Sequence, residues 1–245
     1  MEHVLITGSA RRLGSLIAED LAGAGCFVWI QYRMHGDEAA ALRDRIILNG
    51  GAAECVRADL TDAREIDRML EAIAASDHGG LTTLINNASV IKKGTLGDTS
   101  AEDWDRLMDT NLKAVWYLST RFADSFPNAR RIITIGDASV SRGFAGHAVY
   151  GLSKYALKYL TEQMAIAYAP KIWVNLLSPG LVLQGDKEPD ESWQNRVSRT
   201  LHDNGEIIEA LLKGIRFLMT DPGLTGSELL IDNGLHLHGK PEIMK

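Results

Sequence analysis

Short apolar runs alternate with segments of helical periodicity along the whole chain. The runs are rich in Val, Ile and Leu and are apolar on both faces, which is typical of strands buried beneath helices on both sides. They lie at 4–7, 26–32, 52–57, 81–86, 131–136, 172–178 and 229–231, and the helical segments lie at about 13–24, 37–49, 62–76, 100–125, 148–168 and 206–219. This order predicts an α/β fold, a doubly wound, mostly parallel seven-stranded sheet flanked by helices on both faces.

The alternation runs through residues 1–245 without a linker, a repeat or a low-complexity tract, so we expect a single domain. Residues 180–205 break the rhythm with Gly185, Pro189, Trp193 and many charged residues. A connection of this length inside a compact domain is usually a lid or a binding loop. We therefore predict that 180–205 is a substrate loop.

The charge balance excludes several classes of partner. The 26 Lys and Arg against 32 Asp and Glu give a net charge of −6, which argues against nucleic acid and against an anionic membrane surface. No apolar stretch approaches the roughly 18–20 residues of a membrane span. Residues 1–4 lead into the first strand without a secretory signal, and Cys26 and Cys55 are expected to be free thiols. The sequence thus predicts a soluble cytoplasmic protein.

A glycine-containing turn joins the first strand to the first helix. It reads Thr-Gly-Ser-Ala-Arg-Arg-Leu-Gly at 7–14. Glycine lets the backbone approach a pyrophosphate, whose charge then lies on the free N–H groups of the helix N-terminus. Tight turns also use glycine for steric reasons alone, but the position between the first strand and the first helix favours a nucleotide site.

The end of the second strand indicates which nucleotide binds. A site specific for NAD places an Asp or Glu about 20 residues beyond the glycines, where it bonds the ribose hydroxyls. Here 31–35 reads Gln-Tyr-Arg-Met-His, and the first acid is Asp37. Arg33, together with Arg11 or Arg12, would receive a 2′-phosphate through charge-assisted hydrogen bonds, unless these arginines are only solvated at a sheet edge. The absence of the acid favours NADPH over NADH.

Tyr150 and Lys154 lie four residues apart in the helical segment 148–168, so they project from one face. An ammonium near a phenol lowers the phenol's pKa from about 10 by favouring the phenolate, which makes the tyrosine a usable proton donor and acceptor. Taken alone, the pair also fits an amphipathic helix with a surface Tyr and Lys.

The motifs of the chain, taken together, follow the order of one family. They are Thr7-Gly8 to Gly14, Asp59, Asn86-Asn87-Ala88-Ser89, Asn111, Tyr150 with Lys154, Ser178-Pro179-Gly180 and Asp232-Asn233-Gly234. By them the chain resembles the short-chain dehydrogenase/reductase family over essentially its whole length. The resemblance implies a Rossmann-like fold, a nicotinamide cofactor, and hydride transfer to or from a carbonyl, hydroxyl or imine carbon.

The same resemblance implies roles for single residues. Tyr150 is the acid/base, and Lys154 holds the nicotinamide ribose and tunes Tyr150. Asn111 binds a water of the proton relay, Asp59 accepts from the adenine amino group, and Asn87 lies beside the cofactor. Taken singly, Asp59 also fits a helix N-terminus and Asn111 a polar helix position. The implied cofactor site comprises Gly8, Arg11, Arg12, Leu13, Gly14, Arg33, Asp59, Leu60, Asn87, Ala88, Ser89, Tyr150, Lys154, Pro179 and Gly180.

Two positions depart from the family's pattern. The glycine usual in the sixth position of the phosphate loop is Arg12, and the slot of the catalytic serine, 13 residues before Tyr150, holds Asp137. Ser139 lies 11 residues before Tyr150 and would need a shift in register to fill that slot. A serine donates one hydrogen bond to a substrate oxygen, whereas a carboxylate accepts from N–H groups or, when protonated, donates to a ring nitrogen.

The chain resembles the pteridine reductase branch of the family, which includes bacterial dihydromonapterin reductases. The resemblance rests on the exchange of serine for Asp137, an Arg-Leu-Gly loop end, a Tyr-Arg strand end and an Asn-Ala-Ser turn. This resemblance implies that Asp137 and Tyr150 face the reacting edge of the pterin. It also implies that Ser89 hydrogen-bonds the ring and that Arg12 touches both the cofactor phosphate and the substrate.

The aromatic residue that stacks on the pterin in that branch is here Ile91, which forgoes about 0.5–1.5 kcal/mol of stacking. Ile91 still supplies an apolar wall, and Trp193 or Phe144 would cover the ring from elsewhere. The implied substrate site comprises Arg12, Ser89, Ile91, Asp137, Phe144, Tyr150 and Trp193.

These residues predict an NADPH-dependent reductase of a small-molecule substrate of the dihydrobiopterin or dihydromonapterin class, with Tyr150 supplying the proton. Two alternatives stay open. A general carbonyl reductase of a ketone, sugar or 3-oxoacyl thioester shares fold and cofactor, but a ketone oxygen favours a donor at position 137. A non-catalytic NADPH-binding regulator has no need of Tyr150, Lys154 and Asn111.

The histidines give no metal-ligand pattern. His236 and His238 lie two residues apart near the C-terminus. Such a pair is more often solvent-exposed without a ligand than part of a metal site, so we predict no metal. His147, three residues before Tyr150, fits either a substrate contact or a capping position.

The family resemblance also implies a homo-oligomer, a tetramer or a dimer. The helices at 100–125 and 148–168 form four-helix interfaces in the family. Leu152, Tyr155 and Tyr159 are the candidate residues for that surface.

Overall fold

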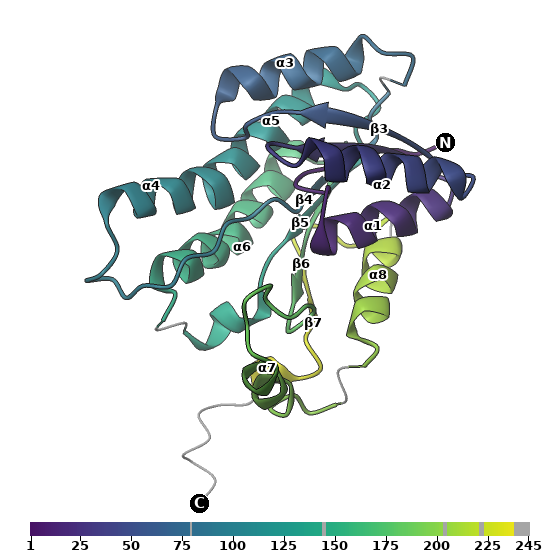
Figure 1. Cartoon of the computed structure of the whole chain (residues 1–245). Coiled ribbons are helices and arrows are strands. Elements are labelled where there is room, and N and C mark those ends of the chain that lie inside the picture. Colours follow the sequence, from purple (N-terminus) through teal and green to yellow (C-terminus); the bar gives the residue numbers. More distant parts are fainter. Residues whose placement is uncertain (79, 144–145, 203–204, 221–222, 238–245) are drawn as a thin grey trace, which may run out of the picture.

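Seven parallel strands form one sheet in the computed structural model of the chain, which describes residues 1–78, 80–143, 146–202, 205–220 and 223–237 (Figure 1). The strands are β1 (His3–Ile6), β2 (Phe27–Tyr32), β3 (Ala52–Arg57), β4 (Thr83–Asn86), β5 (Arg131–Ile135), β6 (Trp173–Pro179) and β7 (Glu228–Ile231). Their order in the sheet is β3-β2-β1-β4-β5-β6-β7, and each neighbouring pair is parallel. The predicted doubly wound sheet is confirmed.

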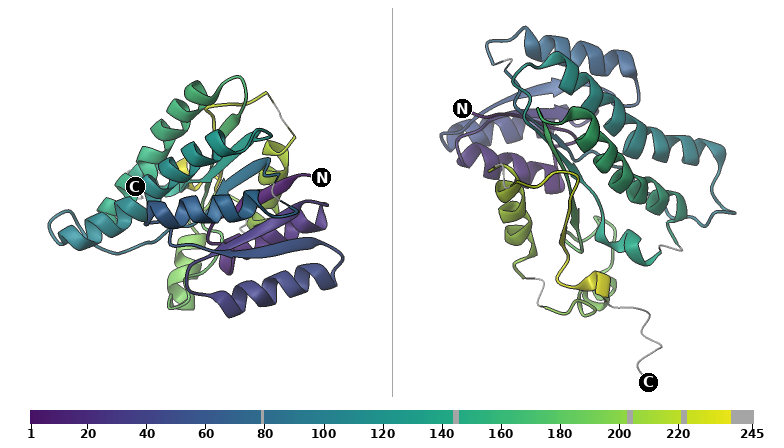
Figure 2. Two further views of the ribbon diagram at one scale, coloured as in Figure 1. Left: turned by 90° about the horizontal axis from the view of Figure 1, so that it is seen from above. Right: turned by 180° about the vertical axis from the view of Figure 1, so that it is seen from behind.

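Helices cover both faces of the sheet (Figures 1 and 2). One face is covered by α1 (Arg12–Gly23), α2 (Gly36–Leu48) and α8 (Ile207–Leu218). The other face is covered by α3 (Ala63–Ala74), α5 (Ala114–Ser125) and α6 (Ala148–Tyr168), with α4 (Ala101–Met108) packed against α6.

β1 shows why the strands are apolar on both faces. Leu5 packs with residues of α3, α5 and α6, whereas Val4 and Ile6 pack with residues of α1, α2 and α8. Successive side chains of a strand point to opposite faces, and all three of these side chains are fully buried. A strand in this position has no solvated face, so its sequence does not alternate with polar residues.

The strand order reverses at β1, which pairs with β2 on one side and with β4 on the other. The crossover connections therefore leave β1 and β4 in opposite directions and open a crevice beyond the carboxyl ends of the strands. The glycine-containing turn 7–14 follows β1 at this crevice. Open α/β sheets bind their ligands at such a point.

Two predicted elements differ from the structure. The helix predicted over 100–125 consists of α4, a π-helical segment η1 (Asp109–Lys113) and α5. A single π-turn adds one residue to a helix without breaking its apolar face, so periodicity did not reveal it. The segment 180–205 contains a short helix, α7 (Asp190–Val197), beyond the ends of β6 and β7 (Figure 1). None of its residues is buried, so no apolar stripe marked it in the sequence.

Candidate active site

A cavity of about 560 Å³ lies at the carboxyl ends of β1, β2 and β4, where the strand order reverses. Most of the predicted cofactor residues line it, namely Gly8, Arg11, Arg12, Leu13, Gly14, Arg33, Asp59, Leu60, Asn87, Ala88 and Ser89. The predicted residues Tyr150, Lys154, Pro179 and Gly180 lie outside this lining, on α6 and at the end of β6. The structure thus brings the phosphate and adenosine side of the predicted site together in one cavity.

The glycines of the first turn allow a close approach of two backbones. A Cβ on Gly8 would lie 2.9 Å from the Cα of Ala88, and a Cβ on Gly14 would lie 2.6 Å from the carbonyl oxygen of Gly8. Gly8 also has φ +61°, in the left-handed region. Because both contacts are to backbone, no side chain can move aside to relieve them. The resulting close-packed turn at the N-terminus of α1 fits the pyrophosphate of a dinucleotide.

Polar side chains brace this turn. Gln31, which is 2% exposed, accepts a hydrogen bond from the N–H of Gly8 at 2.8 Å and donates one to the carbonyl oxygen of Ala58 at 2.8 Å. The amide of Asn87 donates to the carbonyl oxygen of Thr7 at 2.8 Å. The sequence reasoning missed Gln31, although a lone polar residue inside an apolar strand signals a buried hydrogen bond.

Arg33 and Asp59 meet at the far end of the cavity. The Arg33 guanidinium lies 3.5 Å from an Asp59 carboxylate oxygen, and the N–H and hydroxyl of Thr61 donate to Asp59 at 2.9 and 2.7 Å. Burial raises the pKa of the Asp59 carboxyl, but the hydrogen bonds from Thr61 and the charge of Arg33 outweigh it, so the pKa lies below its usual range. A cationic and an anionic side chain are therefore both available to the adenosine half of a nucleotide.

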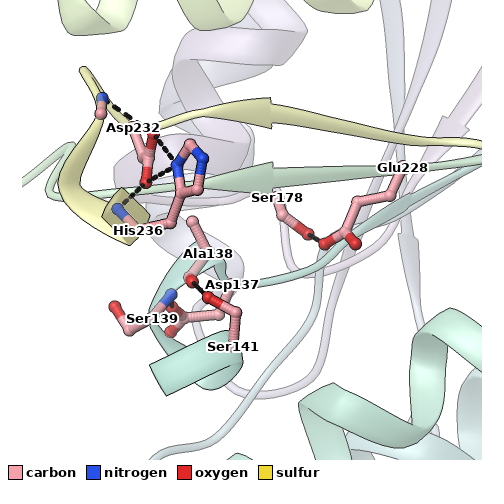
Figure 3. Close-up of polar contacts among 9 residues, drawn as sticks. Asp137, Ala138, Ser139, Ser141, Ser178, Glu228, Asp232 and His236 are labelled. Carbon is pink, nitrogen blue, oxygen red and sulfur yellow. Dashed lines mark hydrogen bonds and ion pairs between the residues drawn. The ribbon is translucent and has the colours of Figure 1, made fainter. Parts of the chain in front are cut away.

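Asp137 fills the slot of the family's catalytic serine. The hydroxyl of Tyr150 donates to Oδ2 of Asp137 at 2.8 Å, and the N–H of Ser139 donates to Oδ1 at 2.8 Å. Ser139 lies in η2 (Ala138–Arg142), a 3₁₀ turn that Asp137 caps (Figure 3). Tyr150 thus bonds Asp137, while Ser139 contributes its backbone N–H to the same carboxylate, and which of the two residues acts in catalysis stays a prediction.

The electrostatics of Tyr150 differ from the prediction. Burial and the Asp137 carboxylate raise the pKa of Tyr150 above its usual value, whereas the sequence predicted that Lys154 would lower it. The phenol points its proton at a carboxylate, which penalises the phenolate, while the Lys154 ammonium donates to the carbonyl oxygen of Ile135 at 2.9 Å. Burial lowers the pKa of Lys154 to about 8, against the opposing charge of Asp137. Tyr150 therefore carries its proton at neutral pH.

Asn111 lies in the π-helical segment and is almost fully buried. Its side-chain oxygen accepts from the N–H of Val90 at 2.8 Å and from the hydroxyl of Ser89 at 3.2 Å. Its side-chain nitrogen donates to the carbonyl oxygen of Val90 at 2.9 Å and to the hydroxyl of Ser153 at 3.1 Å. These bonds use the full capacity of the amide. In this arrangement the side chain fixes the turn after β4, and its part in a water relay stays a prediction.

The backbone at the end of β5 lies very close to a side chain of β6. A Cβ on Gly136 would lie 2.3 Å from the hydroxyl oxygen of Ser178, which donates to Glu228 at 2.7 Å (Figure 3). Because residue 136 is a glycine, the end of β5 can pack closely against β6. This packing places the next residue, Asp137, at the candidate site. Ser178 belongs to the Ser-Pro-Gly motif of the sequence analysis.

The Asp-Asn-Gly motif folds back toward the site. A Cβ on Gly180 would lie 2.7 Å from the Cβ of Asp232, which is 4% exposed and accepts hydrogen bonds from the N–H of Gly234 and from the N–H and ring of His236 (Figure 3). His236 lies in η3 (Leu235–Leu237), which packs against η2. It is thus a partner of Asp232, whereas His238 lies outside the described residues.

The predicted substrate residues are spread more widely. Ile91 is 60% exposed, and Trp193 lies on α7 with the Arg196 guanidinium 5.7 Å from its ring centroid. Arg12 reaches the predicted substrate loop, where Nη2 donates to the carbonyl oxygen of Gln184 at 2.8 Å. Phe144 lies outside the described residues. The contact between Arg12 and the loop was not predicted, because nothing in the sequence pairs residues that far apart.

Within the described ranges, no group of three or more His, Cys, Asp or Glu residues is arranged to hold a metal ion. In the same ranges, no helix has the length and apolarity that a membrane crossing requires.

Comparison with known proteins places this site in a family. Residues 2–195 match the family described as short chain dehydrogenase. The chain is 32% identical over 180 residues to the short-chain dehydrogenase/reductase FrzI of Cladobotryum sp, covering 73% of this chain and 69% of that protein. It is 31% identical over 242 residues to the 3-oxoacyl-[acyl-carrier-protein] reductase FabG of Haemophilus influenzae, covering 95% and 97%.

A solved structure matches over the full length. The crystal structure of FolM alternative dihydrofolate reductase 1 from Brucella canis, complexed with NADP, superposes with a TM-score of 0.91 at 30% identity, covering 100% of this chain and 97% of that one. The chain therefore belongs to the short-chain dehydrogenase family. Its Rossmann-like fold and its nature as an oxidoreductase with a nicotinamide cofactor are confirmed, whereas the roles of single residues stay predictions.

Proposed function

We propose that the chain is an NADPH-dependent reductase of a dihydropterin-like substrate. The observation that carries the proposal is the 2.8 Å hydrogen bond from the Tyr150 hydroxyl to Asp137. Where the family usually has a serine donor, this chain presents a carboxylate beside the proton donor. A carboxylate accepts from ring N–H and amino groups and repels a carbonyl oxygen. The pair therefore suits a substrate whose N–H groups border the C=N bond that is reduced.

The residues around the cavity fit a dinucleotide, because bare backbone at Gly8 and Gly14 and the cations Arg11 and Arg33 line it. When bound, the nicotinamide supplies the hydride to the substrate carbon. The chain supplies the proton, which passes from the Tyr150 hydroxyl to the adjacent substrate nitrogen as Asp137 accepts a substrate N–H. The C=N bond becomes CH–NH, and Tyr150 is left as the phenolate.

In the proposed site Lys154 holds the nicotinamide ribose. It lies one helical turn beyond Tyr150, is buried, and has a pKa of about 8, so it is predominantly charged at neutral pH. Asn111 acts as a positioning residue, because its amide holds the turn that carries Ser89 and Val90.

NADPH is the proposed form of the cofactor. The end of β2 has no acid for the ribose hydroxyls, and Arg33 lines the cavity with its guanidinium 3.5 Å from Asp59. We expect Arg33→Gln to lower kcat/KM for NADPH at least tenfold and to leave that for NADH within twofold. Arg43→Gln, which removes an exposed guanidinium of α2, is the matched control. Equal losses with both cofactors would contradict the phosphate role.

The similar structure described as an alternative dihydrofolate reductase complexed with NADP supports the heterocyclic substrate. The similarity to 3-oxoacyl-[acyl-carrier-protein] reductases of nearly equal length favours a second candidate, a general carbonyl reductase. The two candidates differ at position 137, because a ketone oxygen needs a hydrogen-bond donor there.

The test compares the wild type and Asp137→Ser on dihydrobiopterin, dihydromonapterin and a panel of ketones and 3-oxoacyl thioesters, with NADPH oxidation as the readout. We expect turnover of a dihydropterin by the wild type and a loss of at least tenfold in its kcat/KM in Asp137→Ser. Turnover of ketones alone, preserved or improved by the serine, would establish the carbonyl reductase. Cofactor binding with no turnover on any substrate would establish a non-catalytic regulator.

The oligomer is part of the same proposal. Leu152, Tyr155 and Tyr159 of α6 are 44–67% exposed, and Trp116 of α5 is 49% exposed on the same side of the sheet. We propose that this face pairs with a second copy of the chain in a cytoplasmic dimer or tetramer. Light scattering should give a mass of two or four chains for the wild type and a smaller mass for Tyr159→Glu.

A further inference from the structure

One arginine connects the two halves of the site. Arg12 lines the cofactor cavity and also reaches the substrate loop 180–205, where it donates to the carbonyl oxygen of Gln184 at 2.8 Å and forms an ion pair with Asp186. These contacts join residues more than 170 positions apart in the sequence. The turn that surrounds the predicted phosphate is thus attached to the loop that borders the substrate.

The backbone of Arg12 is unusual. It has φ +55°, in the left-handed region that a residue with a Cβ adopts at a cost, at the first residue of α1. A glycine would adopt the same conformation freely. Such a conformation persists only when surrounding contacts determine it. The contacts of the guanidinium with Gln184 and Asp186 are contacts of this kind.

The loop that Arg12 holds is braced internally. The Gln184 amide donates to the carbonyl oxygen of Glu188 and to Asp190, both at 2.8 Å. The Glu188 carboxylate lies 2.8 Å from the Arg196 guanidinium, whose centre lies 5.7 Å from the ring of Trp193. These contacts join residues of the segment 184–196, including residues of α7, to one another.

The loop has a second attachment at its other end. The N–H of Leu201 donates to the carbonyl oxygen of Asn233 at 2.9 Å, and its side chain fills the space over Gly234. Arg12 and Leu201 thus attach the loop to the rest of the fold at two points.

We propose that Asp186 is a positioning residue that docks the substrate loop onto the phosphate turn through Arg12, so that loop closure and cofactor binding are coupled. The proposal rests on the proposed function in that 180–205 borders the substrate. Nη1 and Nη2 of Arg12 contact the loop, and the same residue lines the cavity proposed for the cofactor. Because such coupling is reciprocal, a bound cofactor should protect the loop, and a docked loop should retain the cofactor.

The test uses Asp186→Asn and Asp186→Arg, with Glu191→Gln as the matched control, because Glu191 is an exposed carboxylate of the same loop. Hydrogen exchange over residues 180–189, expressed as protection factors, is measured with and without NADPH. We expect NADPH to raise protection in the wild type. Asp186→Asn should lower the protection factors measured with NADPH about three- to fivefold, in keeping with an exposed ion pair. Asp186→Arg should lower them more than tenfold.

Steady-state kinetics give the second readout. Asp186→Asn should raise KM for the substrate about three- to fivefold with kcat within twofold, and Asp186→Glu should restore KM. Protection and KM equal to those of Glu191→Gln would overturn the proposal. The exchange readout needs no substrate, so it decides the docking role even where no dihydropterin is turned over and the proposed function has failed.

Discussion

The cofactor half and the substrate half of the site are built by different means. The cofactor half is a shape made of backbone, in which the turn after β1 packs against the turn after β4 so closely that Gly8 and Gly14 have no room for a Cβ. The proposed substrate half depends on side-chain contacts between separate elements, namely Tyr150 of α6 with Asp137 after β5, and Asp186 in the loop after β6 with Arg12. We therefore expect substitutions that add side-chain volume to disturb the cofactor half, and substitutions that change charge to disturb the proposed substrate half.

The charged groups of the substrate half influence one another. Burial and Asp137 raise the pKa of Tyr150, and burial lowers the pKa of Lys154 to about 8. The His147 ring lies edge-on to Tyr150 with centroids 6.4 Å apart, and burial, Lys93 and Arg196 lower its pKa against the charge of Asp137. The proposed substrate half therefore holds ionisable groups whose pKa values are displaced by burial and by neighbouring charges.

The largest expected effect comes from removing the proton donor of the proposed substrate half. Tyr150→Phe deletes the hydroxyl that donates to Asp137 and should lower kcat by about 10²–10⁴, the usual contribution of general acid catalysis. Its dissociation constant for NADPH, measured by the fluorescence of the bound cofactor, should stay within threefold of the wild type. Full turnover in this variant would contradict the assigned proton donor, and lost cofactor binding would contradict the separation of the two halves.

The next effect tests the shape of the cofactor half. Gly8→Ala places a Cβ 2.9 Å from the Cα of Ala88 at φ +61°. Overpacking of this kind costs about 1–3 kcal/mol, which corresponds to roughly 5–150-fold in NADPH affinity if the turns move apart.

Gly25→Ala is the matched control, because Gly25 has φ +88° with nothing within 4 Å of an added Cβ. It carries the backbone strain without the contact and should leave NADPH affinity unchanged. Equal affinities in the two variants would show that the close approach does not shape the cofactor site.

The same contrast explains what the sequence predicted. The parallel sheet and the glycine turn depend on apolar runs and on residues near one another in the chain, so they were visible in the sequence, whereas the strand order comes from the structure alone. Gly14 follows Gly8 by six residues, and both line one cavity as expected. Asp137 was placed by its distance of 13 residues from Tyr150, and the hydrogen bond between them is present.

The features that escaped prediction depend on packing between distant segments. Arg12 contacts a loop more than 170 residues away, and Gln31 bonds two turns that only the folded sheet brings together. The pKa of Tyr150 was predicted from Lys154 one helical turn away, but the acceptor of its proton arrives from the end of β5. Spacing along one helix does not reveal which charge from another element lies nearer.

A smaller effect comes from the buried charge of Lys154. Its pKa is about 8 in the folded chain and about 10.4 when unfolded. Between these values the unfolded chain binds more protons, so the free energy of unfolding rises with pH. From pH 7.5 to 9.5 the wild type should gain about 2 kcal/mol relative to Lys154→Met. Urea unfolding of both proteins at each pH measures the difference, and parallel pH dependences would show that the ammonium is not held in a desolvated site.

The smallest expected effect adds an aromatic ring to the substrate half. Ile91 is 60% exposed, so Ile91→Phe has room to place a ring over the proposed substrate without overpacking. Stacking adds about 0.5–1.5 kcal/mol beyond area burial, which corresponds to roughly a two- to tenfold lower KM for a dihydropterin. Leu96→Phe, at a position of the same segment that is 72% exposed, is the control. A flat ring gains from stacking, whereas an aliphatic ketone does not. A lower KM for the dihydropterin alone would therefore place its ring beside position 91. A lower KM for both substrates would contradict stacking, because it would reflect a general gain in apolar contact.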